Sequence, residues 1–286
     1  MIEQYHHKVT SSFMLWFDHY LLTKGQAYTN ISGAKCYNYD DERLDDRFEA
    51  FGSPYKQWVN DSSVDGATIA NGIYIGNTPS GEYSGGSRGG LKLDFHNGRA
   101  LIETNDQNLD ISCDFAVKDF NIYFTNETED DLIVENKYSI NSRTPSVIES
   151  YIEPYDYVLP AVFIAAATSK NEDFAFGGME ETTINISATV LAEDSYQLDG
   201  VLSIFSDAKN ECIPLVTMAD HPYDEFNDLK SGVYNYNDLS SENPNKLFLN
   251  RTTTSKLTDK IRKSLSNDMF VGFIDFEVQQ HRFRHQ

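Results

Sequence analysis

The chain has 286 residues and a formal net charge of −21, with 40 % hydrophobic and 13 % aromatic residues. This acidic balance argues against a protein that grips nucleic acid, because phosphate binding requires a basic surface. No apolar run reaches the roughly eighteen residues of a membrane span, and the N-terminus lacks the order of a signal peptide. Three widely separated cysteines predict buried free thiols in a reducing compartment.

The charge is distributed unevenly along the sequence. Residues 251–286 contain seven basic and four acidic residues, and this surplus of three positive charges leaves −24 on the rest. Two interpretations stay open. The acidic surface is solvated and keeps the protein soluble, or the basic tail docks on an acidic neighbour such as the next subunit.

The first predicted element is a helix capped by Thr10, Ser11 and Ser12 that ends at Lys24 and Gly25. Its apolar face is wide and aromatic, which is typical of a packed helix. That face consists of Phe13, Trp16, Phe17, Tyr20 and Leu21. We therefore expect residues 1–25 to form an N-terminal helix that packs on the C-terminal domain.

Residues 26–149 are rich in strand signals and predict an inserted antiparallel β-sandwich or barrel-like domain. Asn97 and Gly98 predict a two-residue hairpin turn that places Phe95 opposite Ala100 and Leu93 opposite Ile102. Farther on, the apolar alternation switches from odd to even positions at Lys118 and Asp119, which predicts a β-bulge or bend. The other strands are expected at residues 55–59, 67–75, 109–117, 120–124 and 132–138.

A domain boundary is expected within residues 141–158, so that residues 150–286 form an α/β domain. An apolar strand at 159–164 precedes a strand at 183–190 whose buried face is expected to be Ile184, Ile186, Ala188 and Val190. Asp194 and Ser195 predict a helix start, and apolar side chains follow at helical spacing. These side chains are Leu198, Val201, Leu202 and Phe205.

The rest of this domain is predicted to contain strands at 212–218 and 270–278. Thr254 and Ser255 predict the cap of a short helix at 256–265. The polar, Tyr- and Asn-rich segment 220–250 predicts a long surface loop or an arm that reaches over a neighbouring subunit. Deletion of residues 231–245 is expected to weaken oligomerisation without unfolding the subunit.

No motif identifies a site of chemistry. The histidines lack metal-ligand spacing, and the glycines around Ser87 and Arg88 lack a phosphate-loop ending. Acidic clusters at 40–46 and 127–131 do not fit a calcium loop and are expected to be solvated. We therefore assign no catalytic, cofactor-binding or metal-binding residue and expect a non-enzymatic protein without a cofactor. Paired carboxylates that act on a polysaccharide stay a minor alternative.

Several segments resemble a known class of virion protein. Residues 91–102 resemble the Asp–aromatic–x–Asn-Gly-Arg hairpins of tailed-bacteriophage virion proteins. Residues 9–17, 159–164, 174–178 and 183–205 resemble a neck or tail-terminator-type protein of a contractile-tailed phage. The resemblance implies a tail-terminator-like α/β domain, and residues 26–149 would be a β-rich addition to it.

This resemblance also implies a function and partners. Six copies are expected to form a ring in the virion neck that caps the tail tube and joins it to the head connector. Its neighbours would be tube, sheath or connector proteins, and DNA would only pass through, without specific binding and without any membrane. Assembly is expected in the host bacterial cytoplasm, and acidic walls would keep DNA from sticking.

A binding module is the alternative interpretation of the same sequence. In it, a tail or baseplate β-sandwich recognises carbohydrate or a receptor through exposed aromatic side chains. The candidates for that contact surface are Trp58, Tyr74, Tyr83 and Tyr123. Ring formation would favour the neck interpretation, whereas a monomer or trimer with glycan affinity would favour the binding module.

Overall fold

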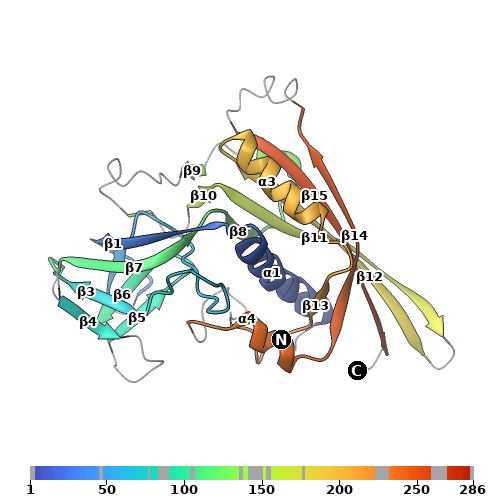
Figure 1. The fold of residues 1–286 in the computed structure, drawn as a ribbon, viewed down its shortest axis with the longest axis horizontal. Helices are drawn as coiled ribbons and strands as arrows, with labels where there is room; N and C mark the ends of the chain where they lie inside the picture. Colours follow the sequence, from blue (N-terminus) through green and yellow to red (C-terminus); the bar gives the residue numbers. More distant parts are fainter. Residues whose placement is uncertain are drawn as a thin grey trace.

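A computed structural model describes residues 4–44, 48–76, 78–82, 90–103, 107–134, 138–140, 151–152, 156–175, 178–222, 232–258 and 269–283. The fold is α+β and rich in strands, as predicted, and most strands belong to two large curled sheets. Figure 1 shows helix α1 (Tyr5–Lys24) between the two sheets and α3 (Ser195–Ser206) on the second sheet.

The first sheet is antiparallel, with strand order β4-β3-β7-β1-β2-β6-β5. Its strands are β1 (Tyr28–Tyr39), β2 (Phe48–Gly52), β3 (Gly72–Ile75), β4 (Thr78–Glu82), β5 (Leu91–Asp94), β6 (Arg99–Glu103) and β7 (Ile111–Lys118). The rings of Trp58 and Phe115 stack 4.2 Å apart at its core. Both side chains are fully buried, so this sheet has a hydrophobic core of its own.

Two strand predictions in this region are wrong. Residues 55–59 are buried but irregular, and only Trp58 forms an isolated bridge, to Val117. The segment predicted as a strand at 132–138 begins with helix α2 (Glu129–Val134), whose N-terminal residues Glu129, Asp130 and Asp131 suit the positive end of a helix. Strands β1 and β2 were not predicted, because their sequences alternate poorly and a bulge interrupts β1 between Ile31 and Ala34.

The predicted hairpin forms, but its register differs by two residues. Leu93 pairs with Ala100 and Leu91 with Ile102, so the loop spans residues 95–98 instead of two residues. A shift of two keeps every apolar side chain on its predicted face, because strand side chains alternate with period two. Gly98 is required here: its φ is +64°, and a Cβ atom would lie 1.9 Å from the backbone oxygen of Tyr55.

The predicted bend after Lys118 is confirmed and marks the passage between the sheets. The chain bends at Asp119 and Phe120, and β8 (Asn121–Phe124) then belongs to the second sheet. Of the segment 141–158 that was expected to hold a domain boundary, residues 141–150 and 153–155 lie outside the described part. The division into three segments therefore stays a prediction.

The second sheet has the strand order β13-β14-β15-β12-β11-β8, with β8 parallel to β11 and the other pairs antiparallel. Its remaining strands are β11 (Ala161–Ala175), β12 (Met179–Ala192), β13 (Cys212–Pro214), β14 (Lys246–Lys256) and β15 (Phe270–Phe283). A small parallel pair, β9 (Tyr138–Ile140) and β10 (Tyr157–Leu159), lies apart. The expected strand at 183–190 is thus part of a longer strand, whereas the one expected at 159–164 is divided at Pro160 between β10 and β11.

Helices α1 and α3 cover one face of the second sheet. Phe17 of α1 stacks on Phe205 of α3 at 4.1 Å, and both rings meet Phe276 of β15 edge-on. The four predicted side chains of β12 are buried in this core, as are the four of α3. The carboxylate of Asp194 accepts a hydrogen bond from the backbone N of Gln197 at 2.7 Å, which confirms the predicted N-cap.

The structure corrects three expectations about helix starts and loops. Helix α1 begins at Tyr5 and not near Thr10; Ser12 is no cap, and its buried hydroxyl accepts a hydrogen bond from Val216 N. Segment 220–250 contains α4 (Tyr236–Glu242) and the start of β14, and its residues 223–231 are not described. Tyr234 and Tyr236 are core residues, so deleting 231–245 would disrupt the subunit itself.

The third correction concerns the short helix expected after Thr254 and Ser255. Both residues lie in β14, where they extend the pairing with β15. Their β-branched or small polar side chains suit a strand as well as a helix cap, so local sequence did not distinguish the two. Residues 259–265 of the expected helix lie outside the described part of the chain.

Candidate functional site

The arrangement that most resembles a catalytic group joins α1 to the loop after Trp58. His19 Nδ1 lies 2.8 Å from Asp61 Oδ2, and the ring of Tyr236 stacks on the imidazole at 4.1 Å. Asp61 Oδ1 accepts hydrogen bonds from the Ser63 hydroxyl at 2.7 Å and from Tyr236 N at 3.1 Å. Burial opposes ionisation of Asp61, but these hydrogen bonds lower its pKa below the ordinary value.

Catalytic chemistry does not follow from this geometry. In a nucleophilic triad the carboxylate holds one imidazole nitrogen and the nucleophile contacts the other. Here the Ser63 hydroxyl lies 3.4 Å from Nδ1 of His19, the same nitrogen that already contacts Asp61. The cluster therefore has the form of a structural cross-link between α1, the first sheet and α4.

Further buried polar contacts hold the two sheets together. Lys118 at the end of β7 pairs with Asp18 of α1 at 2.7 Å, and both side chains are buried. The Gln57 side chain exchanges two hydrogen bonds of 2.8 Å with the backbone of Ile122, so it caps the outer edge of β8. Removing one partner of such a buried pair leaves an unpaired polar group, so these contacts fix the position of the first sheet.

The acidic cluster at 40–46 is not a cation site in its described part. Asp41 pairs with Arg43 at 2.8 Å and with the buried Arg99 at 2.6 Å, so its oxygens already have cationic partners. Burial opposes ionisation of Asp41, but the hydrogen bonds from Arg43 and Arg99 and the charge of Arg99 lower its pKa to about 2. Within the described ranges, no group of three or more His, Cys, Asp or Glu side chains is placed to hold a metal ion.

The three described aromatic candidates of the binding-module interpretation do not form one exposed surface. Trp58 and Tyr123 are buried, in the cores of different sheets. Tyr74 is half-buried and donates a hydrogen bond to Asp114 at 2.9 Å. Tyr83 lies outside the described residues. The thiols of Cys36 and Cys113 are buried 3.8 Å apart, as free thiols were expected to be, whereas Cys212 is exposed.

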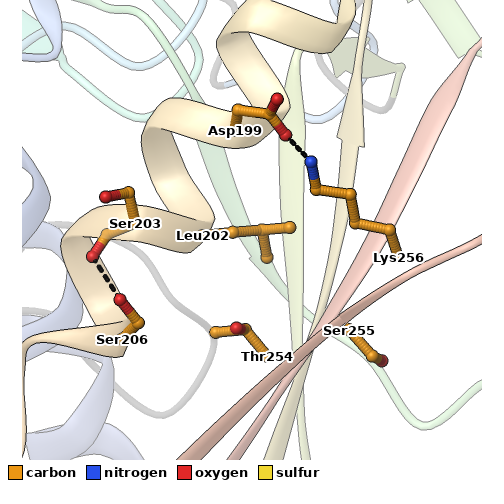
Figure 2. A pocket seen from close by; sticks show the side chains of 7 residues that line it. All are labelled: Asp199, Leu202, Ser203, Ser206, Thr254, Ser255 and Lys256. Atoms are coloured by element: carbon orange, nitrogen blue, oxygen red, sulfur yellow. Dashed lines mark hydrogen bonds and ion pairs between the residues drawn. The ribbon is translucent and has the colours of Figure 1, made fainter.

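A groove of about 390 Å³ lies between α3 and β14. Figure 2 shows the Asp199–Lys256 ion pair at one end, Leu202 pointing toward the sheet, and hydroxyl groups along both sides. The lining residues are Asp199, Leu202, Ser203, Ser206, Thr254, Ser255 and Lys256. Small-molecule pockets are mostly apolar and enclosed. This groove is polar and open, so it suits an extended segment better than a small ligand.

The strand that borders this groove has an unpaired side. β13 pairs with β14 only at residues 246–248, and among the described residues no strand follows beside residues 250–256, which we call the β14 edge. Leu257 N donates to Val271 O at 3.0 Å, and hydrogen-bonded pairs alternate along an antiparallel ladder. The backbone groups of Thr252, Thr254 and Lys256 therefore point away from β15.

On the opposite side of the sheet, no strand other than β12 in the described part of the chain lies beside the outer half of β11. β8 pairs with β11 only as far as Ile164, and residues 168–175, which we call the β11 edge, are all exposed. With β12 they form an arm whose tip extends beyond the helices in Figure 1. Phe174 near the tip is 55 % exposed and contacts only the His281 ring, at 4.2 Å, among aromatic neighbours described.

Sequence reasoning had not identified these two edges. The one useful signal in the sequence was composition: residues 168–173 of the β11 edge are polar on both faces, which a strand inside a sheet seldom is. No known protein-family model matches the chain, and a search of curated proteins finds no match. No helix in the described ranges is long and apolar enough to cross a membrane.

Proposed function

We propose that this protein is a non-enzymatic structural subunit that assembles with copies of itself into a ring. Following the resemblance of its sequence, the ring belongs to the neck of a contractile-tailed phage virion. There it caps the tail tube and joins it to the head connector. Six copies per ring, tube or sheath neighbours, and assembly in the host cytoplasm belong to the same proposal.

The arm of β11 and β12 is the observation that supports this proposal. Its β11 edge is exposed along residues 168–175, and Phe174 lies near the tip with little cover. Ordering an exposed segment costs about 1–2 kcal/mol of conformational entropy per residue, and burial normally offsets that cost. Inside the monomer the outer side of this arm buries almost nothing, so an arm of this kind favours contact with another molecule.

Charge also supports a ring through which DNA passes. The net charge of −21 gives the surface a strong negative potential, which repels phosphate groups at short range. Two of the four aromatic side chains named for the binding-module alternative, Trp58 and Tyr123, are buried and do not contribute to a contact surface.

Native mass spectrometry of the purified chain, followed by negative-stain imaging of each oligomer, tests the proposal. We expect a closed ring with an axial opening and a mass equal to a whole number of subunits, six in the specific form. A monomer at every concentration tested would overturn the proposal of a self-assembling ring.

A further inference from the structure

We infer that the ring closes by strand pairing: the β11 edge of one subunit adds to the β14 edge of the next. The occupant of each edge is a second copy of this chain, and the result is one sheet that continues across subunits. This inference rests on the proposed ring and adds to it the surfaces that meet. Both edges belong to the same sheet and lie on its opposite sides.

The β14 edge offers backbone groups in a position to pair. Thr252, Thr254 and Lys256 direct their N–H and C=O groups away from β15, by the alternation of the ladder. The hydroxyl oxygen of Thr252 is buried and has no hydrogen-bond partner among the described residues. An added strand supplies hydrogen-bond partners to the outward backbone groups, as in other cases of strand addition to a sheet edge.

The groove next to this edge fits the side chains of an incoming strand. Side chains alternate between the two faces of a sheet, so every second side chain of the added strand would enter the space beside α3. The groove offers the hydroxyl groups of Ser203, Ser206 and Thr254. The β11 edge carries Thr168, Ser169 and Asn171, small polar side chains that can bond to hydroxyl groups.

The charges of the two edges are complementary. The β14 edge contains Arg251 and Lys256 and no acidic residue, although Lys256 pairs with Asp199 of α3. The β11 edge contains Glu172 and Asp173 against Lys170, a net charge of −1. Pairing of two β11 edges would bring like charges together, so charge favours the mixed contact.

Contact between two different edges also has the symmetry that a ring requires. A contact between identical surfaces stops at a dimer, whereas a contact between different surfaces leaves one of each open and continues into a closed ring or an open filament. The β11 edge and the β14 edge are different surfaces of every subunit. The observed pair of edges therefore predicts closure of the ring through a head-to-tail contact.

The experiment compares Thr254→Pro with Thr254→Ala. Proline removes the N–H that points outward and is tolerated on an edge strand, whereas alanine keeps the N–H and removes only the side chain. We expect the wild type to form rings by native mass spectrometry, T254A to form rings weakened only by the loss of one groove hydroxyl, and T254P to remain monomeric. Circular dichroism and a thermal melt establish that each variant is folded. A folded T254P that still forms the wild-type ring would overturn the inference.

A second variant keeps the test decisive if T254P does not fold. Glu172→Lys combined with Asp173→Lys reverses the charge of the β11 edge, and Asp207→Lys, an exposed residue after α3, is the control. We expect the double variant to lose the ring and the control to keep it. Rings formed by the folded double variant would contradict the proposed contact.

Mixing the two blocked variants tests the head-to-tail arrangement directly. T254P retains an open β11 edge, and the double Lys variant retains an open β14 edge, so together they can form a single contact. We expect mixed dimers with one copy of each variant and no rings. A mixture that remains monomeric would overturn the inference, and so would dimers of a single variant. If the wild type and every folded variant form rings, the strand-pairing inference fails while the proposed function stands. A wild type that is monomeric would overturn both the inference and the proposed function.

Discussion

Strand β11 passes through two environments, and the comparison between them separates stability from association. Residues 161–164 are buried on both faces of the sheet. Val162 and Ile164 belong to the core under α1 and α3, and Ala161 and Phe163 belong to the core that includes α2. Residues 168–175 of the same strand are all exposed. The first part is Ala-Val-Phe-Ile, and the second is polar except for Phe174 and Ala175. The buried part thus holds the subunit together, while the exposed part is available to a neighbour.

The largest expected loss of stability is in the buried core between α1, α3 and β15. Phe205 stacks on Phe17 at 4.1 Å and also contacts Trp16 and Phe276. Phe205→Ala removes these contacts and leaves a cavity, so we expect the free energy of unfolding to fall by about 3–5 kcal/mol. Urea denaturation of the dissociated subunit measures the loss.

Tyr196 offers a matched control in the same helix. Its side chain is 88 % exposed, so Tyr196→Ala should change the free energy of unfolding by less than about 0.5 kcal/mol. Equal losses of unfolding free energy for Phe205→Ala and Tyr196→Ala would contradict the distinction between the buried core and the exposed surface.

An intermediate effect on stability is expected from a change in pH, through protonation of the half-buried His96. Burial, together with Lys118 and Lys56, lowers the pKa of His96 to about 4, although Asp94 opposes this shift. The folded state therefore favours the neutral ring, and its contribution is present above about pH 6.5 and lost as pH falls toward 4. Because His96 is only half-buried, we expect a loss of roughly 1–2 kcal/mol over this range.

Unfolding curves at pH 7, 5.5 and 4.5 test this expectation for the wild type and His96→Gln. The variant should lose less stability between pH 7 and 4.5 than the wild type. Parallel pH profiles for the two proteins would show that His96 does not cause the loss.

The smallest effect on stability is expected in the arm. Phe174→Ala removes a side chain that is already more than half exposed, so the free energy of unfolding should change by no more than about 0.5 kcal/mol. Urea denaturation in dilute solution measures this change. A loss of several kcal/mol would show that the arm supports the subunit core, which would erase the contrast within β11.

The buried faces of β12 and α3 are also the parts of the fold that were predicted well from the sequence. The alternation of Ile184 to Val190 and the helical spacing of Leu198 to Phe205 come from burial on one face, and periodicity reports burial. Asp194 acts through a local hydrogen bond, so its cap was predictable as well. The phage ring function and its partners stay predictions, because no periodicity bears on them.

Features that depend on distant partners were not predictable. Ser12 looked like a helix cap, but its hydroxyl bonds to Val216 across the core. Residues 55–59 looked like a strand, yet Gln57 uses its side chain to bond to Ile122. The two edges escaped prediction because an edge is defined by missing neighbours in space, which a single sequence does not encode.

The contact between the first helix and the last strand has a consequence for synthesis on the ribosome. Phe13 and Trp16 of α1 pack against Phe276 of β15, and Tyr5 donates a hydrogen bond to Gln280. The aromatic face of α1 is thus synthesised some 260 residues before Phe276, the side chain of β15 against which it packs. Strands β1 to β7 are close together in the sequence, so the first sheet can form while the core of the second sheet is still incomplete. Chaperone contact during translation is therefore expected mainly at the N-terminal helix.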